Sequence, residues 1–152
     1  MKFLLTFITL IMVSNVAYAQ EVYNPEGFWL TQNKRSVIKT EKCGNDNKEL
    51  CGSIYWIIDG GMQTDAKNPD ASKRNQKMCG LEIMRDLTQS NQNRNYWLDG
   101  KIYKADDGDT YNAKIQMLSP NNMTLRGYRG ISLLGKSQSW TRVSTKNYPS
   151  CK

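Results

Sequence analysis

Gly27-Phe28-Trp29 and Ser139-Trp140-Thr141-Arg142 decide the fold, because they open the first and close the last of the strands expected in this chain. A tryptophan ring on the first strand and a guanidinium on the last can stack only if the two strands are neighbours. Trp29 and Arg142 therefore predict a sheet closed on itself. Such a stack contributes roughly 0.5–2 kcal/mol, so we expect Gly27, Trp29 and Arg142 to have a structural role.

Between these ends the chain carries strand patterning at hairpin-scale spacing. The clearest alternation comes after the turn Asp106-Asp107-Gly108, where Tyr111, Ala113, Ile115 and Met117 share one face and polar residues share the other. This pattern is typical of antiparallel sheet, and Asp-Gly suits a tight hairpin turn. The expected strands cover residues 27–32, 35–42, 50–58, 79–87, 96–104, 110–117, 123–128 and 136–143. About eight strands predict an all-β fold, a single antiparallel up-and-down β-barrel whose interior holds side chains or one small ligand.

The connection over residues 59–78 is long and has neither aromatic residues nor a strand pattern. Within it, Asn68-Pro69-Asp70 resembles a helix start, because Asn68 can cap and Pro69 suits the first helical position. We expect a short helix over residues 69–75. The segment is either a lid over the barrel mouth or a solvated surface loop.

The N-terminus has the layout of a secretory signal peptide over residues 1–19. Lys2 precedes an apolar run from Phe3 to Val13, and Ala17-Tyr18-Ala19 provides small residues for cleavage. The run is too short to span a membrane, and no later run is longer. We therefore expect one domain over residues 20–152, not membrane-spanning, in a periplasmic or secreted protein.

The four cysteines of the chain all lie after the leader, and an even number in an exported chain indicates disulfides. Three connectivities are possible. Cys43 and Cys51 bracket a polar loop and are expected to close a hairpin, which leaves Cys79 with Cys151. Their spacings contain no Cys-x-x-Cys pair, so no metal site is expected.

The composition argues against catalysis and against nucleic-acid binding. The chain has no histidine, which removes the commonest general base and metal ligand. We expect no enzyme activity and no cofactor. The formal net charge is +7, but the basic residues are scattered rather than arranged in a stripe. Attraction to anionic lipid, cell-wall polymers or an acidic ligand is a better explanation of this charge.

Strand parity also predicts which residues line the barrel. Trp56, Tyr111, Ile115, Met117 and Leu125 are expected inside, and small residues among the inward positions leave space for a ligand. A mostly apolar wall with a few hydroxyl groups suits a hydrophobic or amphipathic small molecule. The alternative is a filled core without a cavity.

An ordered set of short motifs resembles the bacterial family known as domain of unknown function 2147. The motifs span residues 27–143 and are Gly27-x-Trp29, Leu50-Cys51-Gly52 with Trp56, Asn68-Pro69-Asp70, Cys79-Gly80-Leu81, Gly100-Lys101-Ile102-Tyr103, Asp107-Gly108 with Tyr111, Arg126-Gly127-Tyr128, and Leu134-Gly135 before Trp140-Thr141-Arg142. Asp109 departs from the family, which has a basic residue after the Asp-Gly turn.

This resemblance implies export and a lipocalin-like fold, but it does not assign a biochemical role. Two functions remain open. The first is an exported protein that carries or scavenges a ligand in its barrel. The second is a protein-interaction module, a lipocalin-like inhibitor or envelope-assembly factor, which would use residues 59–78 to contact an envelope or protein partner.

Overall fold

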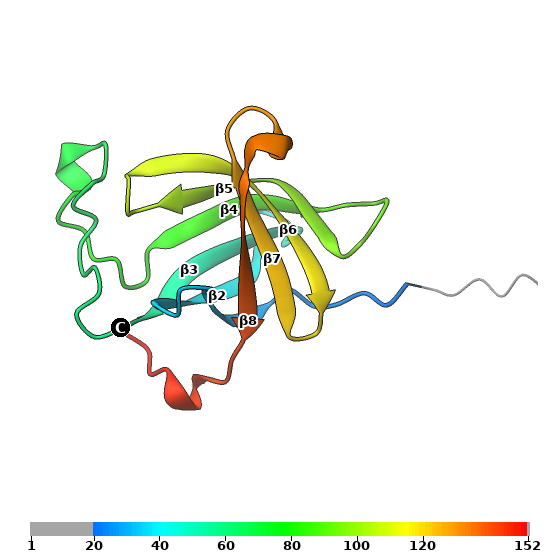
Figure 1. Cartoon of the computed structure of the whole chain (residues 1–152), viewed down its shortest axis with the longest axis horizontal. Coiled ribbons are helices and arrows are strands. Elements are labelled where there is room, and N and C mark those ends of the chain that lie inside the picture. The colour runs from blue at the N-terminus through cyan, green and yellow to red at the C-terminus, as the bar shows by residue number, and fades with distance from the viewer. Residues whose placement is uncertain (1–19, 152) are drawn as a thin grey trace, which may run out of the picture.

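The structure, a computed structural model, describes residues 20–151, so the expected signal peptide lies outside the described residues. Over these residues eight strands form a closed antiparallel barrel in which each strand pairs with the next and β8 pairs with β1 (Figure 1). The strands are β1 (Gly27–Leu30), β2 (Ser36–Cys43), β3 (Glu49–Ile57), β4 (Glu82–Gln89), β5 (Tyr96–Lys104), β6 (Asp109–Ser119), β7 (Asn122–Tyr128) and β8 (Lys136–Arg142). The predicted all-β up-and-down barrel is confirmed.

Helical structure among the described residues is limited to three short 3₁₀ turns, η1 (Ala71–Lys73), η2 (Ser132–Leu134) and η3 (Thr145–Asn147). The helix expected over residues 69–75 is therefore shorter than predicted. It is capped by Asp70, whose side chain accepts a hydrogen bond from the Ser72 amide, and not by Asn68. No helix within residues 20–151 reaches the length and apolar character needed to cross a membrane.

The barrel closes through the predicted pair of strand ends. Trp29 in β1 is the register partner of Arg142 in β8, and the guanidinium carbon lies 4.2 Å from the centroid of the indole ring. Gly27 is required beside this contact because its φ is +138° and a Cβ there would lie 2.3 Å from the Arg142 Nη1. The buried Trp29 indole N–H donates to the carbonyl of Pro25 and to the Thr40 hydroxyl.

The inward faces of the strands form one core. In β6 and β7 the alternation is as predicted, with Ala113, Ile115, Met117, Met123 and Leu125 all buried. Most of this packed core lies toward the end of the barrel that holds the turns 44–48, 90–95 and 119–121, which we call the closed end. The opposite end holds the connections 31–35, 58–81, 105–108 and 129–135, which we call the open end.

A β-bulge changes the parity of β3 near its C-terminal end. Val37 pairs with Trp56 and Ile38 pairs with Ile54, so Tyr55 has no register partner in β2. A bulge inserts one residue and reverses the facing of the residues after it. Trp56 therefore does not continue the inward series of Ile54, and its ring instead meets the Tyr148 ring edge-on at 5.0 Å.

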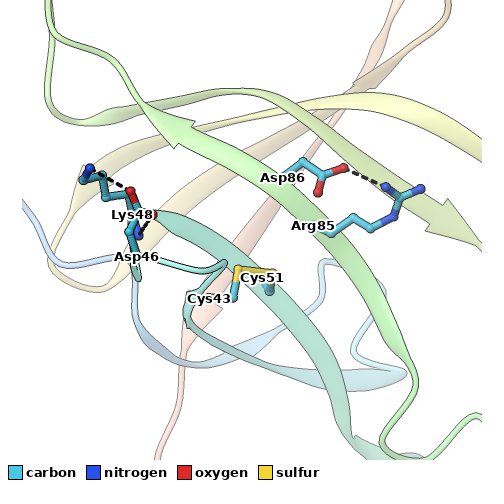
Figure 2. Close-up of a disulfide and its surroundings, with 6 residues drawn as sticks. All are labelled: Cys43, Asp46, Lys48, Cys51, Arg85 and Asp86. Atoms are coloured by element: carbon cyan, nitrogen blue, oxygen red, sulfur yellow. Dashed lines mark hydrogen bonds and ion pairs between the residues drawn. A yellow bond between two sulfur atoms is a disulfide. The ribbon is translucent and has the colours of Figure 1, made fainter.

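Both disulfides have the predicted connectivity. Cys43–Cys51 joins β2 to β3 across their hairpin, next to the ion pair of Asp46 and Lys48 in the turn (Figure 2). Cys79–Cys151 attaches the C-terminal segment to the end of the long β3–β4 connection. The Cys151 amide also donates to the Tyr55 carbonyl, so the tail is fixed against the outside of the barrel.

Candidate functional site

A cavity of about 550 Å³ occupies the open end of the barrel. Its wall is mainly apolar and comes from strands on all sides of the barrel. The wall includes Ile38 and Ile54 from β2 and β3, Ile102 and Leu125 from β5 and β7, and Trp140 from β8. Most of these side chains sit at inward-facing positions of their strands, so the alternating pattern that builds the core also builds this wall.

The mouth of the cavity is polar and carries more basic than acidic side chains. Arg35, Lys104, Arg129 and Lys136 contribute to the lining, together with a single carboxylate, Asp106. Arg35 lies 3.9 Å from Asp106, while Lys104 pairs with Asp107 and Arg129 with Asp109. Within residues 20–151, no carboxylate lies within ion-pair distance of Lys136. The mouth therefore offers a cationic group to an acidic ligand.

The long β3–β4 connection forms part of the cavity wall through Gly61, Met62 and Met78. It is anchored by Asp65, which is fully buried. The Asp65 carboxylate accepts hydrogen bonds from Tyr103 Oη at 2.6 Å, Asn68 Nδ2 at 2.6 Å and Gln76 Nε2 at 3.0 Å. The connection is therefore tied to β5.

The hydrogen bonds at Asp65 also set its protonation state. Burial alone would raise the pKa of this carboxyl, but the bonds from Tyr103, Asn68 and Gln76 outweigh burial and hold the pKa below its ordinary value. Burial and the neighbouring carboxylate both raise the pKa of Tyr103. Tyr103 thus stays a proton donor and Asp65 a charged acceptor throughout the neutral range.

A second set of contacts joins this connection to the β5–β6 turn. Lys67 Nζ donates to the Asp106 carbonyl at 2.6 Å. The Gly108 backbone approaches so closely that a Cβ there would lie 2.0 Å from the Lys67 carbonyl oxygen. The segment considered as a possible lid is thus packed onto its neighbouring turn.

The sequence-predicted lining residues divide into three groups. Tyr111 and Leu125 line the cavity. Ile115 and Met117 are buried in the packed core instead. Trp56 lies outside this wall because of the β3 bulge, and Ile57 takes the lining position.

Several lining residues were not predicted. Ile38, Ile102 and Trp140 lie on expected strands, so strand parity could have identified them. Met62 and Met78 come from the connection without periodicity, where no local sequence pattern indicates that a side chain faces the barrel. The described residues contain no group of three His, Cys, Asp or Glu side chains that could hold a metal ion.

Comparisons with known proteins agree with this architecture. A solved structure from the human pathogen Helicobacter pylori, described as a protein of the lipocalin family, superimposes with a TM-score of 0.72. Its sequence is 22% identical, and the match covers 83% of this chain and 87% of that one. This likeness shows the fold. No curated protein matches the chain.

The family comparison covers most of the barrel. Residues 27–142 match the family described as an uncharacterized protein conserved in bacteria, domain of unknown function 2147. The match begins at the glycine beside the Trp29–Arg142 contact and ends at Arg142, so it extends from the first strand to the last. The chain belongs to this bacterial family, and its fold is that of a lipocalin-like barrel.

Proposed function

We propose that this protein binds a small amphipathic molecule, with an apolar body and an acidic head group, in the cavity at the open end of the barrel. The observation that supports this proposal is the cavity of about 550 Å³, with its apolar wall and basic mouth. Sites for small ligands commonly occupy roughly 300–1,000 Å³ and are mostly apolar with a few placed polar groups.

The head group would lie at the mouth, with Lys136 as its principal partner. Arg35, Lys104 and Arg129 are already paired with carboxylates, which lowers their attraction for a further anion. Lys136 is exposed and lines the same cavity. The apolar body would lie against the isoleucine side chains below.

The proposed role is carriage or scavenging rather than catalysis. The chain has no histidine, and its four cysteines are paired in disulfides, so the commonest general base and the free thiolate nucleophile are both lacking. The two disulfides are consistent with an extracytoplasmic protein. We propose that it acts in the periplasm or after secretion.

The test is a fluorescence titration with an anthroyloxy-labelled stearate as the probe. Gly127→Leu places a side chain in the cavity, and the position tolerates a Cβ because its nearest neighbours would be 3.5 Å and 3.8 Å away. Thr124→Leu places the same leucine side chain on the opposite face of β7, which does not line the cavity. We expect binding to weaken at least about tenfold in Gly127→Leu only.

The head-group assignment is tested by competition with laurate and with lauryl alcohol. Lys136→Gln should weaken displacement by laurate roughly fivefold and leave displacement by the alcohol unchanged. Native mass spectrometry of the exported protein, purified without detergent, would identify a carried ligand as a discrete added mass. Equal probe affinity in Gly127→Leu and the wild-type protein would overturn the proposal.

A further inference from the structure

An exposed apolar loop stands beside the mouth of the cavity. Ile131, Leu133 and Leu134, in and beside η2, have 61%, 82% and 77% of their surface exposed. Figure 1 shows η2, in orange, projecting beyond the strands at the top of the view. Three large apolar side chains exposed within four residues form a patch of the kind that marks an interaction site.

Several backbone groups of this loop already have hydrogen-bond partners. Arg126 Nε donates to the Ser132 carbonyl at 2.8 Å, and Arg126 Nη2 donates to the Leu133 carbonyl at 3.0 Å. The Leu134 and Gly135 amides donate to the carbonyls of Ile131 and Ser132. Backbone groups that already have partners can approach an apolar medium without a large desolvation cost. The loop is therefore held in a conformation that presents its apolar side chains outward.

The charge around the loop defines what it can contact. Residues 126–136 contain Arg126, Arg129 and Lys136 and no acidic residue. Arg129 and Lys136 are both exposed. Arg129 pairs with Asp109 of β6, whereas Lys136 has no carboxylate partner within residues 20–151. An apolar tip with an unpaired basic side chain beside it is complementary to the surface of an anionic bilayer, where apolar groups enter the acyl boundary and cations remain among the head groups.

We propose that the 131–134 loop docks the protein on anionic lipid bilayers, with Ile131, Leu133 and Leu134 inserted at the interface and Lys136 among the lipid phosphates. The mouth of the cavity then faces the membrane, because Leu134 and Gly135 belong to its wall. This docking goes beyond the proposed ligand binding and does not depend on it.

The experiment is co-sedimentation of the mature protein with vesicles of phosphatidylcholine alone or with phosphatidylglycerol added. The test variant is Ile131→Ser/Leu133→Ser, since neither residue lines the cavity. The matched control is Leu118→Ser, which removes an apolar side chain that is 52% exposed near the closed end. Thermal unfolding establishes that each variant is folded.

We expect binding to phosphatidylglycerol vesicles that weakens with added salt, falls at least about tenfold in the double variant and is unchanged in Leu118→Ser. Stearate-probe affinity should remain unchanged in the double variant, which separates docking from the cavity. Equal vesicle binding by the wild-type protein and the double variant would overturn the proposal. So would a dimer that the double variant abolishes, without vesicle binding, because the patch would then join two copies of the chain.

Discussion

Replacing Arg142 with methionine tests how the barrel is held closed. Its guanidinium donates to three backbone carbonyls, those of Pro120 at 2.7 Å, Glu26 at 2.6 Å and Asn24 at 2.6 Å. It also lies over the Trp29 ring at 4.2 Å. One side chain thus connects the N-terminal segment, the β6–β7 turn and the first strand. Methionine keeps much of the side-chain volume and removes all four contacts.

The magnitude depends on the exposure of each contact. The partly buried hydrogen bond to Glu26 is worth about 1.5 kcal/mol as a charge-assisted bond, and the two exposed ones about 0.5 kcal/mol each. Stacking on Trp29 adds about 1 kcal/mol. Arg142→Met should therefore lower the free energy of unfolding by about 3–4 kcal/mol. Arg142→Lys keeps a charge but not the three-way geometry, so its loss should be intermediate.

Urea unfolding monitored by tryptophan fluorescence measures these differences. Arg85→Met is the matched control, because Arg85 is exposed and has one ion pair, with Asp86 (Figure 2). Its loss should stay below about 0.5 kcal/mol. If Arg142→Met costs no more than this control, the closure does not depend on the guanidinium and the reasoning fails.

The other predictions concern the open end and the tail. Asp65→Asn should lower the free energy of unfolding by about 2–3 kcal/mol at pH 7, because a buried charged acceptor is lost. The folded-state pKa of Asp65 lies below its ordinary value of 3.8, so its contribution is present above that pH and is lost as the pH falls through the folded pKa. The difference in the free energy of unfolding between wild type and variant, measured by urea titration, should therefore narrow below about pH 4. A difference that stays constant with pH would contradict the role of a charged Asp65. Replacing Cys79 and Cys151 with serine should lower the free energy of unfolding by about 4 kcal/mol in the chain-entropy account. The comparison, by thermal unfolding, is a variant lacking Cys43–Cys51. That disulfide closes a shorter loop, so its removal should lower the free energy of unfolding less. Gly108→Ala should destabilise by at least about 1 kcal/mol, because its φ is +77° and the Lys67 carbonyl blocks a Cβ; a neutral result in urea unfolding would show that the turn can move away.

The closure of the barrel could be predicted because a pair of residues on the first and last strands indicates it, whatever the lengths of the loops between them. Trp29 and Arg142 occupy the two terminal strands, and stacking requires those strands to be adjacent. The inward face of β6 could also be predicted from the sequence, because Ile115 and Met117 alternate strictly with polar residues through a regular stretch of strand. An alternating pattern shows which side chains of a strand face inward wherever no bulge interrupts the strand pairing.

The same alternation gives the face of a side chain but not its depth along the barrel axis. Ile115 and Leu125 both face inward and are register partners, yet only Leu125 reaches the cavity. The depth at which the packed core gives way to the cavity depends on side chains from all the strands together. Trp56 shows a second limit, because a bulge adds one residue without leaving a mark in the local pattern.

The distribution of stabilising contacts explains how the open end can expose Leu133 and its neighbours. The Trp29–Arg142 contact and most of the packed core lie toward the closed end, while Asp65 and the Cys79–Cys151 disulfide fix the long connection. The β7–β8 loop contributes no buried residue between Arg129 and Gln138. Its apolar side chains therefore add little to folding. The exposure of Leu133 and Leu134 therefore favours contact with another surface, and Leu134, which lines the cavity, places that surface where a ligand would enter.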